Sequence, residues 1–313
     1  MPRPAPVTGP DRRSIRLARL LVWLGSAGAR PLKGVSVEDA RFPGPTGAPA
    51  VRVRLYRPPD LRPDAPALLW FHGGGYYMGA MGMDERRCSE FALELGALVA
   101  SVDYRLAPEH PFPAALEDGY AALVGLSARA GQLGIDPARI AIGGASAGGG
   151  LAAALAQVAQ DRQAVRPVFQ LLIYPMLDDR TGLTDDPDEA RRRVWGASDN
   201  RFGWAAYLGR DVDRSNPPAY ASAARRADLS GLPPAWIGVG ALDLFHDEDV
   251  AYAARLRACG VACETVVVPG AYHGFDVVAP KAGVVIGFKR DQVAALRHAF
   301  IEAAISATTH NIS

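Results

Sequence analysis

Short apolar segments alternate with helical segments along most of the chain, and this alternation is the feature that most constrains its fold. Strands that alternate with helices usually form a mostly parallel sheet with helices on both faces. We therefore predict an α/β fold. The expected strands are residues 51–56, 67–71, 97–102, 139–143, 168–174, 235–240 and 265–268, and the expected helices are residues 84–95, 114–130, 147–160, 248–258 and 291–305.

The apolar pattern differs between the strands and indicates an edge and a centre of the sheet. Residues 51–56 alternate apolar residues with arginine, which is typical of a strand with one buried face. Residues 67–71 are continuously apolar, which is typical of a strand buried on both faces.

The alternation fails between residues 178 and 228, where charged residues are followed by the aromatic residues Trp195, Phe202, Trp204 and Tyr207. We predict that residues 178–228 are a helical cap inserted over the ligand-binding end of the sheet. Residues 1–45 are expected to add N-terminal cap helices. The catalytic domain then comprises residues 46–177 and 229–313.

Composition excludes several classes of protein. The 34 basic and 33 acidic residues nearly cancel, so no nucleic-acid partner is expected. Cys88, Cys259 and Cys263 lack the spacing of a disulfide framework or a zinc site, which favours a reducing cytoplasm and no metal. No apolar run is long enough to span a membrane. Arg16 and Arg19 interrupt the N-terminal apolar run, so we expect no signal peptide there. We expect instead an amphipathic helix that covers the active site or lies on a membrane surface.

Ser146 is the candidate nucleophile. It lies in the sequence Gly144-Ala145-Ser146-Ala147-Gly148, between a predicted strand and a predicted helix. A serine on such a sharp turn needs small neighbours, because side chains at the glycine positions would collide with the strand and the helix. The start of the helix also favours the negative charge that develops during acyl transfer.

A second glycine-rich segment, from His72 to Gly75, follows the buried strand that ends at Phe71. Successive glycines leave backbone N–H groups accessible, and donors aimed at a developing oxyanion contribute strongly to acyl transfer. We interpret this loop as the source of such donors and His72 as a residue that braces it.

A serine hydroxyl needs a base, and that base needs an orienting carboxylate. His273 lies in a loop after the last predicted strand, whereas His110 occupies a turn, His298 a helix and His310 the C-terminal tail. Asp243 follows the strand at residues 235–240, which suits the chain order nucleophile, acid, base. Asp247 and Glu248 compete with Asp243, but they are more typical of the start of the next helix.

These motifs resemble the hormone-sensitive lipase family of bacterial carboxylesterases, also called family IV, from about residue 51 to residue 275. The resemblance includes the segments Asp103 to Ala114, Gly231 to Ala235 and His273-Gly274-Phe275. It implies an α/β-hydrolase fold with a helical cap and an oxyanion hole made by the N–H groups of Gly74, Gly75 and Ala147. The resemblance also implies hydrolysis of short- to medium-chain esters without a cofactor, and possible assembly as a homodimer.

Four aromatic residues are candidates for substrate binding: Tyr76, Tyr77, Trp204 and Phe275. For Tyr76 and Tyr77, packing in the core is an equally good interpretation. Two residues depart from the family pattern, Ala145 before the serine and His246 after the acid, and neither removes a triad member. Ala145 changes the hydrogen-bond support expected around the nucleophile, which puts rate and pH optimum in doubt rather than the reaction class.

Other functions are compatible with the same fold. The triad also suits a lactonase or an amidase, and esters are favoured by analogy alone. A hormone-receptor-like binding module would lack the catalytic histidine, which this chain retains. A membrane-associated lipase that uses its N-terminal helix is a further alternative. The small-molecule partner expected from the family resemblance is an ester.

Overall fold

The computed structural model describes residues 12–310 except 185–188, 190–191, 210–212 and 214. Its centre is an eight-stranded sheet with the order β1-β2-β4-β3-β5-β6-β7-β8. The first two strands are antiparallel to each other and β2 is antiparallel to β4, whereas all other neighbours are parallel. The strands are β1 (Ser36–Phe42), β2 (Val51–Arg57), β3 (Ala65–Phe71), β4 (Leu98–Asp103), β5 (Ile135–Ala145), β6 (Gln170–Ile173), β7 (Ala235–Gly240) and β8 (Cys263–Val268).

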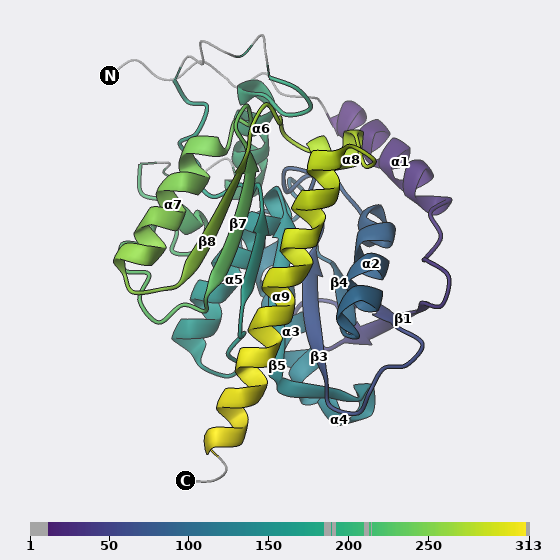
Figure 1. Cartoon of the computed structure of the whole chain (residues 1–313). Coiled ribbons are helices and arrows are strands. Elements are labelled where there is room, and N and C mark those ends of the chain that lie inside the picture. The colour runs from purple at the N-terminus through teal and green to yellow at the C-terminus, as the bar shows by residue number, and fades with distance from the viewer. Residues whose placement is uncertain (1–11, 185–188, 190–191, 210–212, 214, 311–313) are drawn as a thin grey trace.

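Helices cover both faces of this sheet (Figure 1). On one face, α3, α5 and α7 share a buried apolar cluster with strand residues such as Leu69, and on the other, α2 and α9 share a cluster with residues such as Trp70. The α-helices are α1 (Arg12–Ala27), α2 (Glu85–Leu95), α3 (Ala114–Ala128), α4 (Ala130–Leu133), α5 (Ala147–Arg162), α6 (Ala197–Leu208), α7 (His246–Ala258), α8 (Phe275–Val278) and α9 (Gly283–His310), and Met81–Asp84 and Ala223–Arg225 are short 3₁₀ helices.

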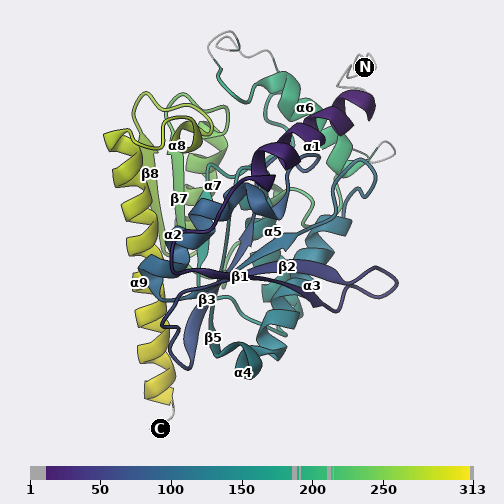
Figure 2. The ribbon, with the colours of Figure 1, turned by 90° about the vertical axis from the view of Figure 1, so that its right-hand side faces the viewer.

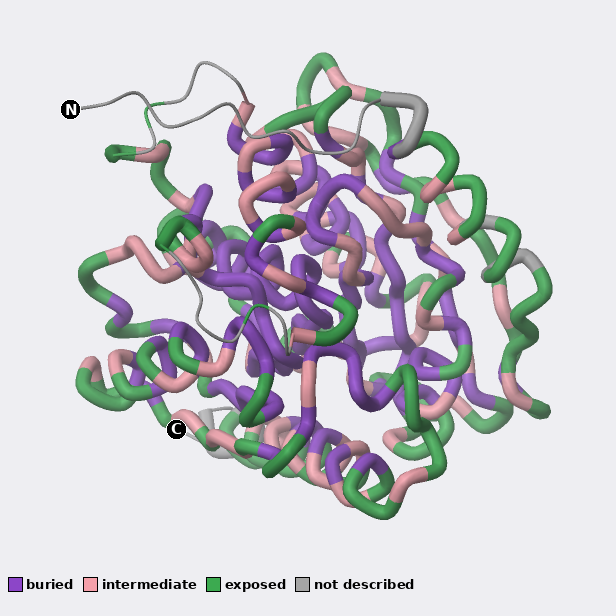
Figure 3. The backbone as a smooth tube through the Cα atoms, turned by 90° about the horizontal axis from the view of Figure 1, so that it is seen from above, coloured by how far each residue is buried: buried purple, intermediate pink, exposed green. Residues whose placement is uncertain are grey.

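The structure confirms the predicted α/β architecture and every predicted strand. The continuously apolar segment forms β3, which is buried between β4 and β5 because helices cover both of its faces. Helix α9 begins earlier and ends later than the predicted range of 291–305, and it includes His310, so the prediction of a tail at His310 is wrong. Viewed from above, the buried backbone lies mainly in the centre of the molecule and the exposed backbone mainly at its periphery (Figure 3).

The prediction of helices throughout residues 1–45 is wrong for Ser36–Phe42, which form strand β1. Most side chains of β1 are exposed or half-buried, so the segment lacks the apolar alternation by which a strand is recognised. Its conformation comes instead from a seven-residue antiparallel ladder with β2. The alternating segment at β2 therefore pairs with β1 on its outer side, so β1 and not β2 is the edge of the sheet.

Helices α1 and α6 both lie above the carboxyl ends of the strands (Figures 1 and 2). The Arg19 side chain fixes α1 there, because its Nε donates to the carbonyl of Tyr77 over 2.8 Å and its terminal nitrogen donates to Ala107 O and Glu109 Oε2. Parts of both predicted cap segments, including residues 1–11 and 185–188, lie outside the described residues. Among the described helices, none has the length and hydropathy needed to cross a bilayer.

Candidate active site

Ser146 occupies a sharp turn between strand β5 and helix α5. Its φ of 58° and ψ of −123° lie outside the regions that residues with side chains ordinarily adopt. The flanking glycines permit this turn. A Cβ at Gly144 would lie 2.3 Å from the backbone of Gly148, and one at Gly148 would lie 2.1 Å from the carbonyl oxygen of Phe71. The need for small neighbours, predicted from the sequence, thus has a direct steric cause.

Ser146, His273 and Asp243 come together at the carboxyl ends of β5, β8 and β7. His273 Nε2 is 3.0 Å from Ser146 Oγ, and its Nδ1 is 2.9 Å from Asp243 Oδ2. The Asp243 side chain is fully buried and that of His273 is 6% exposed. A neutral imidazole with its proton on Nδ1 donates to Asp243 and accepts the Ser146 hydroxyl, which is the arrangement a general base needs.

The structure separates Asp243 from the carboxylates that competed with it in the sequence. The second Asp243 oxygen, Oδ1, accepts the backbone N–H of Phe245 over 3.0 Å, which fixes the carboxylate. Helix α7 begins at His246, so Asp247 and Glu248 lie in its first turn, as predicted. The Asp247 side chain is fully exposed and contacts His246 rather than His273.

The glycine loop after β3 lies directly against the serine. A Cβ at Gly73 would be 3.3 Å from Ser146 Cβ. Gly74 and Gly75 both have positive φ, and within the described part of the chain neither of their N–H groups donates to another backbone carbonyl. Ala147 is the first residue of α5, so its N–H has no partner within the helix. These three N–H groups remain the candidates for an oxyanion hole.

His72 braces this loop. It is 1% exposed, its Nδ1 is 2.8 Å from Gly73 O, and its ring stacks on Tyr104 with centroids 4.3 Å apart. The Tyr104 hydroxyl in turn donates to the carbonyl of His72 over 2.8 Å. Burial lowers the pKa of His72, so the imidazole is neutral in this apolar setting.

The aromatic candidates for substrate binding are buried in this structure. Tyr76 stacks on Tyr207 with centroids 4.0 Å apart, and its hydroxyl donates to the carbonyl of Met176. Tyr77 and Trp204 are 4% and 1% exposed. Tyr77 contacts Phe202 of α6 edge-on, so it joins the glycine loop to the inserted segment.

Phe275 lies in a different apolar cluster from the other three aromatic candidates. Its side chain packs on Phe288 of α9, with centroids 4.9 Å apart, inside the apolar cluster on the α2 and α9 face of the sheet. It follows His273 closely in the sequence, but the start of α8 turns its ring into the core. Phe275 therefore belongs to the hydrophobic core of this structure.

Three other aromatic residues surround the His273 ring, and none was singled out from the sequence as a neighbour of the base. Tyr174 and Phe245 pack edge-on against it, with centroids 4.7 and 5.1 Å away, and Trp195 lies 6.3 Å away. A Cβ at Gly75 would clash with Trp195, so this residue also covers the glycine loop. Of these three residues, only Phe245 could have been placed near the base from the sequence, because it lies two residues after Asp243.

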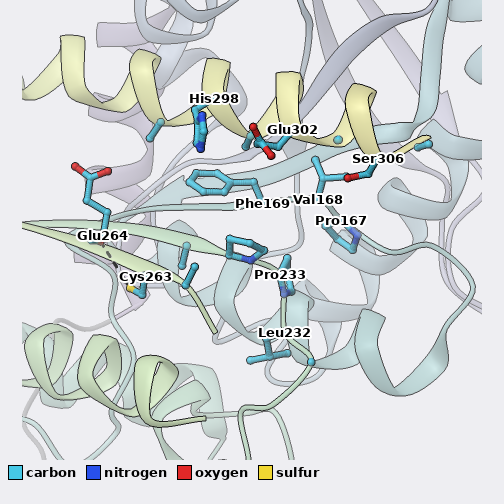
Figure 4. A pocket seen from close by; sticks show the side chains of 18 residues that line it. Pro167, Val168, Phe169, Leu232, Pro233, Cys263, Glu264, His298, Glu302 and Ser306 are labelled. Carbon is cyan, nitrogen blue, oxygen red and sulfur yellow. Dashed lines mark hydrogen bonds between the residues drawn. The ribbon is translucent and has the colours of Figure 1, made fainter. Parts of the chain in front are cut away.

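Two further observations concern metal ligands and cavities. Within the described residues, no group of three His, Cys, Asp or Glu side chains could hold a metal ion. A cavity of about 770 Å³ lies between α9 and the segments that enter β6, β7 and β8, lined by residues such as Phe169, Pro233 and His298 (Figure 4). It is at the amino ends of these strands, whereas the triad is at the carboxyl ends, where α/β sheets bind their ligands.

Comparison with known proteins agrees with this fold. Residues 68–277 match the family model described as the α/β-hydrolase fold. The chain belongs to the α/β-hydrolase family. This α/β-hydrolase is 38% identical to esterase LipI of Mycobacterium tuberculosis over 76% of this chain and 74% of LipI. It is 36% identical to carboxylesterase NlhH of the same species over 90% and 89% of the two chains.

Solved structures extend the similarity to three dimensions. A bacterial heroin esterase matches this α/β-hydrolase with a TM-score of 0.85 at 38% identity, covering 92% of this chain and 91% of its own. Esterase LipW from Mycobacterium marinum gives a TM-score of 0.82 at 36% identity, over 93% and 91% of the chains.

A buried carboxyl near the site makes the stability of this α/β-hydrolase depend on pH. Glu248 Oε1 accepts the backbone N–H groups of Leu177 and Asp178 over 2.6 and 3.3 Å. Burial raises the pKa of Glu248 from its ordinary 4.5 to about 8. The folded state therefore keeps this proton to a higher pH than the unfolded state does, so stability is lost as the pH rises from about 4.5 through 8.

We expect Glu248→Gln to remove this loss, because glutamine keeps the acceptor oxygen and cannot ionise. Its free energy of unfolding should exceed that of the wild type by on the order of a few kcal/mol at pH 8 and differ little at pH 4.5. Urea unfolding at both pH values measures this difference. The exposed Glu264→Gln is the control, and an equal effect of both substitutions would contradict the assignment.

Proposed function

We propose that this chain is a carboxylesterase that hydrolyses short- to medium-chain carboxylic esters through an acyl-enzyme on Ser146. The observation that carries the proposal is the continuous contact from Ser146 Oγ through His273 to the buried Asp243, beside a glycine loop with available N–H groups. The similar proteins named esterase and carboxylesterase, aligned over most of both chains, support the same reaction class.

In the proposed mechanism, His273 Nε2 takes the Ser146 proton as Oγ attacks the ester carbonyl. The negative charge on the carbonyl oxygen is stabilised by N–H groups of Gly74, Gly75 and Ala147. His273 then returns the proton to the departing alcohol, while Asp243 stabilises the imidazolium. A water molecule repeats the sequence on the acyl-enzyme and releases the acid.

The proposal includes a helical cap formed by the N-terminal helix and the segment after residue 178. The position of α1 and α6 above the carboxyl ends of the strands supports it. It also includes a cytoplasmic location, supported by the three free cysteines. A homodimer is the remaining prediction, which light scattering on the purified protein tests.

Hydrolysis of p-nitrophenyl esters of increasing acyl length tests the proposed activity. We expect turnover of the acetate and butyrate and a decline for long chains, because bulky buried aromatic side chains crowd the site. The corresponding p-nitroanilides should react far more slowly. Absence of turnover of any ester by the folded wild type would contradict the proposal and favour a binding protein, and faster cleavage of the anilides would favour an amidase.

A further inference from the structure

A buried ion pair joins helix α2 to helix α8 directly behind the His273 loop. The Arg87 guanidinium donates to Asp276 Oδ2 over 2.6 Å, and the two side chains are 9% and 0% exposed. The other Asp276 oxygen accepts the hydroxyl of Tyr174 over 2.7 Å. A single carboxylate, three residues after His273, thus connects a charged side chain with the tyrosine that packs edge-on against the imidazole.

Each end of this network is held by the rigid core. Arg87 lies over the Trp70 ring of central strand β3, 5.6 Å from its centroid, and Trp70 Nε1 donates to Asp84, which also faces Arg87 at 3.8 Å. At the other end, the backbone N–H of Tyr174 donates to Gly238 O over 2.7 Å. Tyr174 is therefore fixed both at its backbone and at its hydroxyl.

We propose that Asp276, held by Arg87, is a positioning residue for the base of this hydrolase: through the Tyr174 hydroxyl it fixes the ring against which the His273 imidazole packs. The inference rests on the proposed function, in which His273 serves Ser146. A base must keep both nitrogens within hydrogen-bond distance of their partners, and a small rotation of the imidazole would lengthen the contact with Ser146 Oγ or with Asp243.

The main test is Asp276→Asn, which keeps the size of the side chain and removes the charge that faces Arg87. We expect kcat for p-nitrophenyl butyrate to fall about 10-fold to 100-fold with an unchanged KM, because the substrate-contacting surface is untouched and only the alignment of the base is lost. Tyr174→Phe leaves the ion pair and the ring in place and should lower kcat about 10-fold. This second variant remains informative if the unpaired Arg87 prevents Asp276→Asn from folding.

Asp118→Asn is the matched control. Asp118 is also a buried carboxylate paired with an arginine, Arg105, at 2.8 Å, but it has no contact with the His273 ring. We expect this variant to lose stability and to keep its kcat when assayed well below its unfolding temperature. An apolar double variant, Arg87→Met with Asp276→Leu, should regain stability without regaining kcat.

Proton NMR gives a readout that needs no ester turnover. The Nδ1 proton of His273, shared with Asp243, should give a far-downfield resonance in the wild type and in Asp118→Asn that broadens or disappears in Asp276→Asn. Wild-type kcat and resonance in Asp276→Asn, or full recovery of kcat in the apolar double variant, would overturn the positioning role. Activity retained by Ser146→Ala would instead overturn the proposed function itself.

Discussion

Ser146→Ala is expected to reduce ester hydrolysis by roughly a million-fold, the loss seen when the nucleophile of other serine hydrolases is removed. The change deletes one oxygen atom, which contacts His273 Nε2 at 3.0 Å. Without that atom no acyl-enzyme forms, and only slow attack by water beside the N–H donors remains. Assay of p-nitrophenyl butyrate with purified protein measures the loss.

The folded state should tolerate this change. Alanine is smaller than serine, and the turn depends on Gly144 and Gly148 rather than on the hydroxyl. The thermal unfolding midpoint of the variant should therefore equal that of the wild type or lie slightly above it. Mass spectrometry after treatment with a fluorophosphonate should show one adduct on the wild type and none on the variant. Wild-type turnover by Ser146→Ala would refute the assignment.

Asp243→Asn is expected to reduce kcat about ten-thousand-fold, as it does in other serine triads. Asparagine keeps the shape of the side chain, but its amide can present an N–H group to His273 Nδ1. The imidazole then carries its proton on Nε2, where it can no longer accept the Ser146 hydroxyl. The loss should appear in kcat. It should be partly relieved at high pH, where hydroxide can remove the Ser146 proton in place of His273.

Asp247→Asn is the matched control for this prediction. Asp247 competes with Asp243 in the sequence, yet its side chain is fully exposed and contacts only His246 among the described groups around it. Its loss should change kcat by less than about two-fold, within the range expected for an exposed surface residue. A large loss of kcat in Asp247→Asn together with full activity of Asp243→Asn would mean that Asp247, and not Asp243, orients His273.

The sequence by itself determined the fold class and the residues that meet at the triad. Strand and helix periodicity are local properties, so the parallel core from β3 to β8 could be predicted from them. The sharp turn at Ser146 depends on glycines only two positions away. Asp243 and His273 each follow a recognisable strand. The carboxyl ends of parallel strands meet at one edge of a sheet, so residues that follow such strands come together there.

Only the tertiary structure decided what surrounds the triad. Strand β1 exists because of its ladder with β2, not because of its own apolar pattern. Phe275 is turned into the core by α8, although it lies two residues from His273. The Asp276 contacts with Tyr174 and Arg87 join positions 102 and 189 residues apart. Contacts between such distant segments leave no periodic signal in the chain, because they arise only when packed layers bring the side chains together.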